Sequence, residues 1–256
     1  MKHFALTLVV LAAMSVPSLA QAPVRTMSAS TNKLNVEQLQ NESQNVQLSR
    51  YFFAGYNTLC LPMSLTAEQL SAAAKDLTVE RLAAIRQEGN VLNLYFVDCT
   101  SEGIQAGVPY LVYSPTSQYL RARTADALRV DTSLKAVRMS DAEGNVVTFS
   151  SSWEAIAKEG RYGIPAQQNV TPLESVLIRT EADKTFLPTR CGFSWDKQSS
   201  TASELRICHA AMGEVNAITG VEKTQTDVDT YDLSGRKVVG NQKKGIYVVG
   251  GEKVIK

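Results

Sequence analysis

The chain is dominated by short segments in which apolar and polar residues alternate, and turn-forming residues separate these segments at short intervals. Alternation with a period of two is typical of a strand with one buried face. Many short strands with frequent turns predict an all-β fold, mainly antiparallel and similar to a β-sandwich. The strand-like segments are 46–52, 57–61, 92–97, 107–113, 136–139, 146–149, 176–179, 185–187 and 205–210.

One or two short helices are expected among these strands. Thr66 and Gln69 form a capping box, in which each side chain bonds the backbone amide of the other residue, and this predicts a helix from there to about Lys75. Residues 79–86 have helical propensity, whereas their length and their position between turns favour a strand. Residues 153–158 are expected to form about one helical turn.

The first 20 residues have the three regions of a secretory signal peptide. Lys2 supplies the positive charge, an apolar run extends from Phe4 to Val16, and small residues stand at Ser18 and Ala20. The apolar run is shorter than the roughly 20 residues that cross a bilayer. We therefore predict cleavage after Ala20 and export of the rest of the chain, with an uncleaved anchor as the alternative.

Removing these 20 residues from 256 leaves 236, and 25 basic residues then balance 25 acidic ones, because Lys2 is the one charged residue removed. A balanced chain lacks the clustered Lys and Arg that nucleic-acid binding requires, so no nucleic-acid partner is expected. No later apolar run approaches membrane length, which predicts no transmembrane segment in the mature chain. The expected organisation is a signal peptide at 1–20, a flexible leader at 21–44, a β-sandwich-like domain at 45–215, and a linker with a C-terminal hairpin unit at 216–256.

All four cysteines fall in the part that is predicted to be exported, where thiols can be oxidised. Four cysteines allow three pairings, and sequence alone does not choose among them. The pairings that are closest along the chain are Cys60–Cys99 and Cys191–Cys208. The alternative is four buried free thiols, since cysteine is among the most buried residue types.

Catalytic signatures are missing from the sequence. No G-x-S-x-G elbow, P-loop, H-E-x-x-H or G-x-G-x-x-G occurs. The predicted mature chain holds one histidine, His209, which disfavours multi-histidine metal sites and Ser–His catalysis. On a strand Cys208 and His209 point to opposite faces, so a thiol nucleophile for this histidine has to come from another cysteine. We expect no catalytic residues and no cofactor.

Two groups of side chains are candidates for binding. Asp227, Asp229 and Asp232 are closely spaced carboxylates of the kind that Ca²⁺ binds, but the segment lacks the glycine and terminal glutamate of an EF-hand loop, and a solvated linker is the alternative. Tyrosines are concentrated in the first half of the chain. Exposed on a sheet they would suit a glycan or a protein ligand, whereas the alternative places most of them in the core or at its rim. These tyrosines are Tyr51, Tyr56, Tyr95, Tyr110, Tyr113 and Tyr119.

Two segments of this region form a recognisable pair. Tyr56–Pro62 reads YNTLCLP, and Ile104–Val112 reads IQAGVPYLV. Together they resemble a module repeated in secreted proteins of Bacteroidota, in which an NT-[LI]-C-L-P strand precedes AGxPYLV. The resemblance covers roughly residues 45–215 and weakens after Gly160. It implies an all-β, surface-associated module, often a stalk or accessory part of adhesin-like proteins, and no catalytic activity.

The end of the chain has a second distinctive pattern, and short strands flanking a Gly250-Gly251 hairpin turn are expected there. Segments 231–238 (YDLSGRKV) and 244–249 (KGIYVV) resemble the end of the C-terminal sorting domain of type IX secretion cargo. The upstream Pro- and Asn-rich strand of the full sorting domain is not visible, so the tail is an abbreviated form. The resemblance implies recognition by secretion machinery. Its matching residues are Tyr231, Asp232, Gly235, Arg236, Gly245 and Tyr247.

These features predict a non-enzymatic module at the cell surface or outside the cell, which mediates adhesion or protein interaction. Its expected partner is an unknown protein or glycan. The first alternative is a carbohydrate-binding accessory protein, and the second is a cysteine-dependent hydrolase. Retention in the periplasm is the alternative location.

Overall fold

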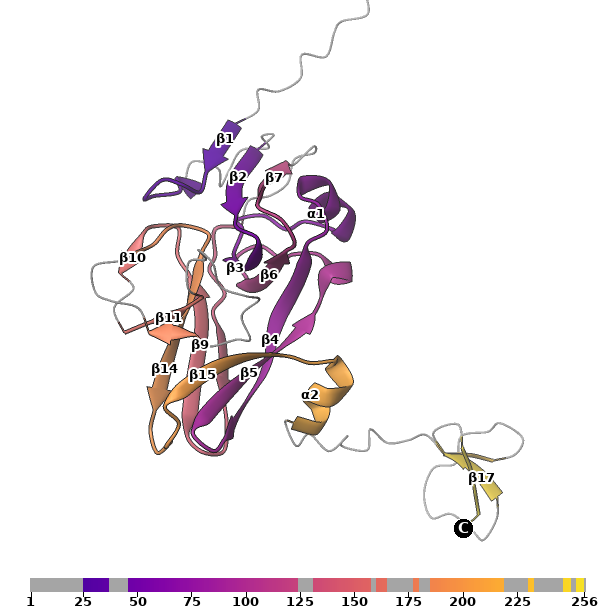
Figure 1. Cartoon of the computed structure of the whole chain (residues 1–256). Helices are drawn as coiled ribbons and strands as arrows, with labels where there is room; N and C mark the ends of the chain where they lie inside the picture. The colour runs from indigo at the N-terminus through magenta and orange to yellow at the C-terminus, as the bar shows by residue number, and fades with distance from the viewer. Residues whose placement is uncertain are drawn as a thin grey trace, which may run out of the picture.

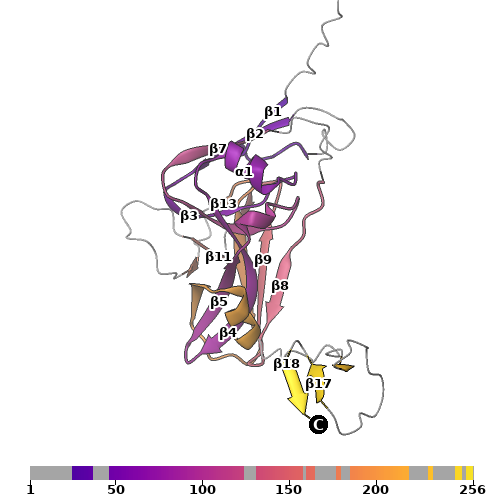
Figure 2. The same cartoon turned by 90° about the vertical axis from the view of Figure 1, so that its right-hand side faces the viewer.

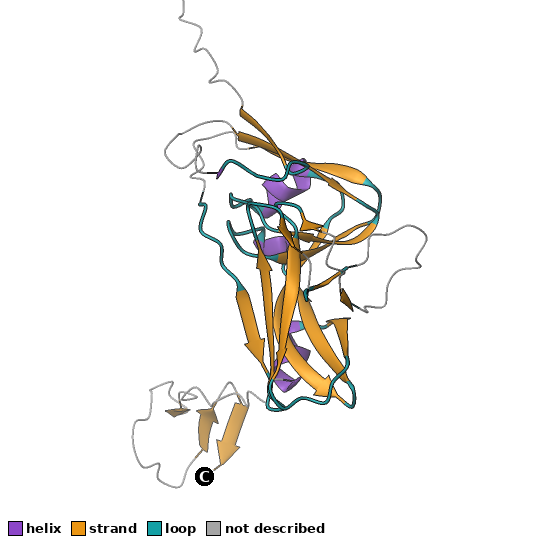
Figure 3. Cartoon of the chain, turned by 90° about the vertical axis from the view of Figure 1, so that its left-hand side faces the viewer, coloured by secondary structure: helices purple, strands orange, loops and turns teal. Residues whose placement is uncertain are grey.

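The computed structural model describes residues 25–36, 46–123, 131–157, 160–164, 177–179, 185–218, 230–232, 246–249 and 252–255. Strands make up most of the described chain and helices only a small part of it, as Figure 3 shows. The predicted all-β class is therefore confirmed. The predicted signal peptide lies outside the described residues. In the described part of the chain, no helix has the length and apolar character needed to cross a membrane.

The first large sheet has five strands in the order β15-β5-β4-β6-β3 (Figure 1). All neighbours are antiparallel except β15 and β5, which run parallel. The segment 79–86, for which the sequence left helix and strand open, belongs to the long strand β4. The strands are β3 (Gly55–Leu59), β4 (Thr78–Glu88), β5 (Val91–Asp98), β6 (Tyr110–Ser114) and β15 (Glu204–His209).

The second large sheet also has five strands, in the order β12-β11-β14-β9-β8. Every pair in it is antiparallel. Figure 2 shows β8 and β9 running along one side of the body. The strands are β8 (Val137–Ser140), β9 (Asn145–Ser151), β11 (Tyr162–Gly163), β12 (Ile178–Arg179) and β14 (Cys191–Lys197).

Three phenylalanines join the two large sheets in one core. Phe96 of β5 meets Phe149 of β9 and Phe193 of β14 edge-on, with ring centroids 5.9 and 6.2 Å apart. Phe149 and Phe193 are stacked, with centroids 4.3 Å apart. All three side chains are fully buried. Because inward residues of two sheets interdigitate in this way, the body has the character of a β-sandwich.

A third sheet, in the order β1-β2-β7, lies at one end of the body beside the first helix (Figures 1 and 2). Its strands are β1 (Arg25–Ser28), β2 (Val46–Phe52) and β7 (Gln118–Arg123). The flexible leader predicted for 21–44 is wrong for residues 25–36, because β1 pairs in parallel with β2, and Leu34 and Val36 are buried in the core. The remainder of that segment lies outside the described residues.

The two helices are short. The predicted capping box is present at the start of α1 (Ala67–Ala73), where Thr66 Oγ1 accepts from Gln69 N and Gln69 Oε1 accepts from Thr66 N. Helix α2 (Met212–Ile218) follows β15, and Val215 packs on the face of β4 and β5 that is opposite the main core. A 3₁₀ turn, η2 (Thr100–Glu102), follows β5.

The helical turn predicted for 153–158 is wrong. Ile156 and Ala157 form strand β10 (Ile156–Ala157), which pairs with β13 (Thr185–Phe186). Trp153 and Ala155 bond the backbone of the N-terminal segment, so long-range pairing overrides the local propensity here. At the end of the chain, β16 (Thr230–Asp232), β17 (Ile246–Val249) and β18 (Glu252–Ile255) form a three-stranded antiparallel sheet.

Candidate functional site

Three aromatic side chains gather on the outward face of the three-stranded sheet. Leu48, Arg50 and Phe52 of β2 face inward and are buried, so Tyr51 faces outward. Tyr51 is the direct cross-strand partner of Tyr119 in β7. Phe53 follows the end of β2, and Phe53 and Tyr119 are each 50% exposed. We refer to Tyr51, Phe53 and Tyr119 as the aromatic patch.

The rings of the aromatic patch pack against one another by their edges. The Tyr51 centroid lies 5.1 Å from that of Phe53 at an interplanar angle of 89°. It lies 5.0 Å from that of Tyr119 at 64°. Edge-to-face packing suits the quadrupoles of aromatic rings. The patch is therefore a ridged surface and not a set of coplanar rings.

The loop that carries Phe53 is held in place by hydrogen bonds. Asn57 Nδ2 donates to the carbonyl oxygens of Phe53 and Gly55, at 2.8 and 2.9 Å, and Asn57 Oδ1 accepts from Phe53 N at 3.3 Å. Ser117 Oγ accepts from Ala54 N at 3.1 Å. These bonds fix the backbone on both sides of the exposed ring, so the patch presents a preorganised surface.

The charge around the aromatic patch is basic. Arg121 and Arg123 are exposed on the same face of β7, and the Arg121 guanidinium carbon lies 5.4 Å from the Tyr119 ring centroid. A cation over an aromatic face is attracted by the ring quadrupole. The strands β1, β2 and β7 contain no Asp or Glu. This face therefore combines apolar rings with positive charge.

The other tyrosines that the sequence singled out do not belong to this patch. Tyr110 is buried, and its hydroxyl oxygen accepts from Gln105 N at 3.1 Å. Tyr56, Tyr95 and Tyr113 are half-buried on the first large sheet. The sequence thus named two members of the patch, Tyr51 and Tyr119, but missed Phe53, whose alternation with Tyr51 is the signal that could have revealed it.

A second polar cluster lies on the first large sheet. His209 Nδ1 is 2.8 Å from Oε1 and 3.0 Å from Oε2 of Glu80, and Glu80 is only 6% exposed. The imidazole also stacks on the Tyr56 ring, with centroids 4.9 Å apart at 17°. Sequence analysis did not identify Glu80, because its approach to His209 depends on how the sheet curls.

The four cysteines are free thiols in the structure, and neither predicted local pairing is present. Burial raises the pKa of Cys191 to about 12 and that of Cys99 to about 11, and it also raises the pKa of Cys60 and Cys208. No hydrogen bond joins His209 to a cysteine in the described part of the chain. The thiol–histidine pair that a hydrolase needs is therefore not assembled among these residues.

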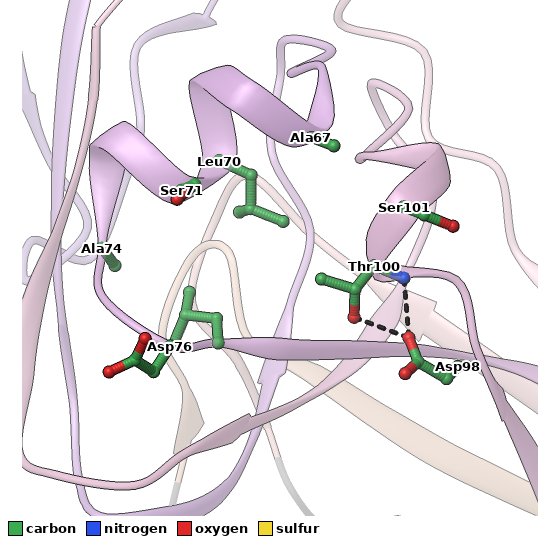
Figure 4. A pocket seen from close by; sticks show the side chains of 9 residues that line it. Ala67, Leu70, Ser71, Ala74, Asp76, Asp98, Thr100 and Ser101 are labelled. Carbon is green, nitrogen blue, oxygen red and sulfur yellow. Dashed lines mark hydrogen bonds between the residues drawn. The ribbon is translucent and has the colours of Figure 1, made fainter.

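A shallow groove of about 580 Å³ runs between α1 and η2 (Figure 4). Leu70 and Leu77 contribute apolar surface, and Asp76 and Asp98 contribute carboxylates. Asp98 Oδ1 already accepts from Thr100 N at 2.8 Å and from Thr100 Oγ1 at 2.6 Å. The groove therefore has one carboxylate that is engaged by its own loop, and we assign no ligand to it.

Metal ligands are not clustered in the described residues, where no group of three His, Cys, Asp or Glu side chains converges. Of the Ca²⁺ candidates, Asp227 and Asp229 lie outside the described residues, and Asp232 is described only as part of β16. Three sorting-like residues, Gly235, Arg236 and Gly245, also lie outside the described residues, while Tyr231 and Tyr247 are in β16 and β17.

No protein family model, no curated protein and no solved structure matches the chain.

Proposed function

We propose that the protein is an exported, non-enzymatic module at the cell surface that mediates adhesion by binding a protein partner through the aromatic patch. The single observation that carries this proposal is the fixed cluster that half-buried Tyr51 forms with exposed Phe53 and Tyr119 on the outward face of a sheet. Exposed apolar clusters mark interaction sites, whereas isolated apolar residues do not. Tyrosine and phenylalanine are also enriched at protein interfaces.

The charge of the surrounding face supports an acidic partner surface. Arg121 lies over the Tyr119 ring, Arg123 is exposed further along the same face of β7, and the three strands carry no carboxylate. Complementary charge raises the association rate and excludes partners of the same sign. The proposed partner is accordingly a protein surface that presents Asp or Glu side chains around an apolar contact.

A glycan ligand is the less favoured alternative. Sugar rings stack on flat aromatic faces that are open to solvent. In the aromatic patch the ring planes meet at 89° and 64°, so each ring uses part of its face or edge on its neighbour. A ridged apolar surface of this kind fits a protein side chain better than a planar sugar face.

The raised pKa values of the thiols also support a role in binding over cysteine-dependent hydrolysis. A nucleophilic cysteine needs a depressed pKa or an adjacent base. Burial instead raises the pKa of all four cysteines, and the imidazole of His209 is engaged with Glu80.

The location at the cell surface rests on the two ends of the sequence. Residues 1–20 have the pattern of a secretory signal peptide. The tail resembles an abbreviated sorting domain of type IX secretion cargo, and the body resembles a module of adhesin-like proteins of Bacteroidota. In this proposal the signal peptide directs the chain out of the cytoplasm, and the sorting-like tail directs it across the outer membrane.

Binding assays with matched variants test the proposal. The purified mature chain would be applied to a panel of immobilised extracellular-matrix proteins, to poly-L-glutamate and to a glycan array. We expect binding to a protein ligand and no hit on the glycan array. The triple variant Tyr51→Ser, Phe53→Ser, Tyr119→Ser should bind this ligand at least about tenfold more weakly, since aromatic anchors contribute a large share of interface energy.

The matched control is the double variant Leu134→Ser, Met212→Ser, which removes exposed apolar side chains outside the patch. It should bind as the wild type does. Arg121→Glu, Arg123→Glu should weaken binding most at low salt, where charge steering is strongest. Unchanged protein binding by the triple variant would refute the proposed site, and glycan binding that the triple variant loses would support the carbohydrate-binding alternative.

A further inference from the structure

Two cysteines that are far apart in the sequence lie side by side in the core. Cys60 directly follows β3, and its backbone N donates to the carbonyl oxygen of Thr189 at 3.0 Å. Cys191 begins β14, and its backbone N donates to Thr58 Oγ1 at 2.8 Å, while Thr58 Oγ1 donates to the Cys191 carbonyl oxygen at 3.1 Å. These bonds align the end of β3 with the start of β14, so the two large sheets meet at this point.

The side chains of the two cysteines share one polar neighbour. Ser151 lies near both thiols, it is the direct cross-strand partner of Cys191, and its hydroxyl donates to the carbonyl oxygen of Arg190 at 2.9 Å. Cys191 lies close enough to Cys60 to raise the pKa of the Cys60 thiol, and both side chains are almost completely buried. The two thiols therefore lie in the same closed part of the core, next to Ser151.

The guanidinium of Arg50 lies beside this pair. Its Nη1 donates to the carbonyl oxygen of Thr189 and, at 3.3 Å, to the Thr189 hydroxyl. Arg50 Nε has no hydrogen-bond partner, and the side chain is fully buried. The positive charge of Arg50 favours the thiolate forms of Cys60 and Cys191. Burial still raises the pKa of both thiols overall, so Arg50 offsets only part of the cost of forming the thiolate that reacts in disulfide exchange.

The other two cysteines occupy different places. Cys99 lies between β5 and η2, where its backbone N donates to the Val79 carbonyl oxygen at 2.8 Å. Cys208 pairs in register with Tyr95, and Tyr95 packs with the small cluster under α2. Neither is a thiol neighbour of Cys60 or Cys191. Cys99 therefore lies apart from Cys60, and Cys208 lies apart from Cys191, although these are the pairings that are closest along the chain.

We propose that Cys60 and Cys191 form a disulfide bond in the exported protein, which cross-links the two sheets of the sandwich. The proposal rests on the export that is part of the proposed function, because an oxidising compartment is required. The oxidant is the disulfide of a thiol–disulfide oxidoreductase. One cysteine thiolate attacks that disulfide, forms a mixed disulfide and releases one thiolate of the oxidoreductase. The second cysteine thiolate then attacks the sulfur of the first cysteine and releases the other thiolate of the oxidoreductase. One S–S bond forms in the chain, the oxidoreductase gains two electrons and becomes a dithiol, and two protons leave the cysteines.

The bond also has a structural consequence. It closes a loop from residue 60 to residue 191, which includes β4 to β6 and all of the second sheet up to β14. Long closed loops restrict the unfolded chain the most in the chain-entropy account of disulfides. An oxidised chain should therefore resist unfolding better than a reduced one.

Mass spectrometry of the wild-type chain tests the proposal without a substitution. The full chain, with its signal peptide, would be produced for export, alkylated under denaturing conditions, and digested without reductant. The same chain without residues 1–20, made in a reducing cytoplasm, is the reference in which all four thiols are alkylated. We expect one cross-linked peptide that joins Cys60 to Cys191 and is lost on reduction, and we expect Cys99 and Cys208 to be alkylated.

Variants add a functional readout. Reductant should lower the thermal unfolding midpoint of the wild type and of the double variant Cys99→Ser, Cys208→Ser. It should leave the midpoint of the double variant Cys60→Ala, Cys191→Ala unchanged. A chain that is exported yet has four free thiols, or that links Cys60 to Cys99 or Cys191 to Cys208, overturns the disulfide. A chain that stays in the cytoplasm instead overturns the export on which the proposed function depends.

Discussion

His209 Nδ1 lies 2.8 Å from Glu80 Oε1, although β5 separates their two strands in the sheet. The same imidazole stacks on Tyr56 of β3, which is the strand at the opposite edge from β15. Contact between side chains from the two edges of a five-stranded sheet requires strong curling. The cluster of His209, Glu80 and Tyr56 therefore holds the sheet in its curled form.

We expect His209→Ala to lower the free energy of unfolding by about 1–3 kcal/mol, because the buried carboxylate of Glu80 loses its partner. Urea denaturation of the purified mature chain measures this change. Arg206→Ala on the same strand is the control, since it removes an exposed ion pair with Glu204 and should cost less than about 1 kcal/mol. A double-mutant cycle of His209→Ala with Glu80→Gln should give a coupling of at least about 0.5 kcal/mol. Additive effects would contradict the proposed link.

Alkaline pH should weaken the fold partly through Tyr56. Burial and the nearby Glu80 raise the pKa of Tyr56 to about 12, against about 10 in the unfolded chain. Between these two values the folded chain keeps a proton that the unfolded chain has lost, so stability falls as pH rises through this window. Tyrosinate absorbance of wild type minus Tyr56→Phe should show one group that titrates near pH 12. A difference titration near pH 10 would contradict the burial of this hydroxyl.

Gly107 occupies a position that no other residue fits. Its φ is +75°, and a Cβ would overlap the carbonyl oxygen of Ser133. Its own backbone N donates to Leu61 O at 2.8 Å, and its carbonyl oxygen accepts from Lys135 N at 2.9 Å. The glycine of the AGVPYLV segment thus joins three parts of the chain, which gives a physical reason for that motif.

We expect Gly107→Ala to destabilise the chain by about 3 kcal/mol, because the positive φ and the overlap both oppose a side chain. Gly89→Ala is the matched control. Gly89 has a φ of +62° but nothing lies within 4 Å of its would-be Cβ, so the change should cost only about 1–2 kcal/mol. Thermal unfolding of both variants measures the difference. Equal midpoints would mean that the close approach at Ser133 is not maintained in solution.

The features that local sequence predicts well are those that local physics determines. The alternation in 92–97 predicted β5, and the spacing of Thr66 and Gln69 predicted the start of α1. The errors fall where distant segments decide. The polar composition of 21–44 predicted a flexible leader, yet residues 25–28 form a strand because β2 supplies their hydrogen-bond partners.

The candidate site is harder to predict for the same reason. Tyr51 and Tyr119 are far apart in the sequence, and their meeting depends on the register between β2 and β7. The strands β7 and β14 were not predicted, since Gln118–Arg123 carries two arginines and Cys191–Lys197 begins with Cys-Gly. Cys60 and Cys191 lie close together because the two large sheets contact each other. No spacing of residues in the sequence predicts that contact.

The C-terminal segment should act in transport more than in folding. Strands β16, β17 and β18 pair in a sheet of their own, and in the proposed function the tail is a sorting signal. We expect deletion of residues 221–256 to reduce the amount of protein at the cell surface while the thermal midpoint of the purified domain changes little. Surface labelling and differential scanning calorimetry measure the two effects, and a deletion of residues 1–20, which should retain the chain in the cytoplasm, is the control for export. Unchanged surface display together with a much lower midpoint would show instead that the tail stabilises the body.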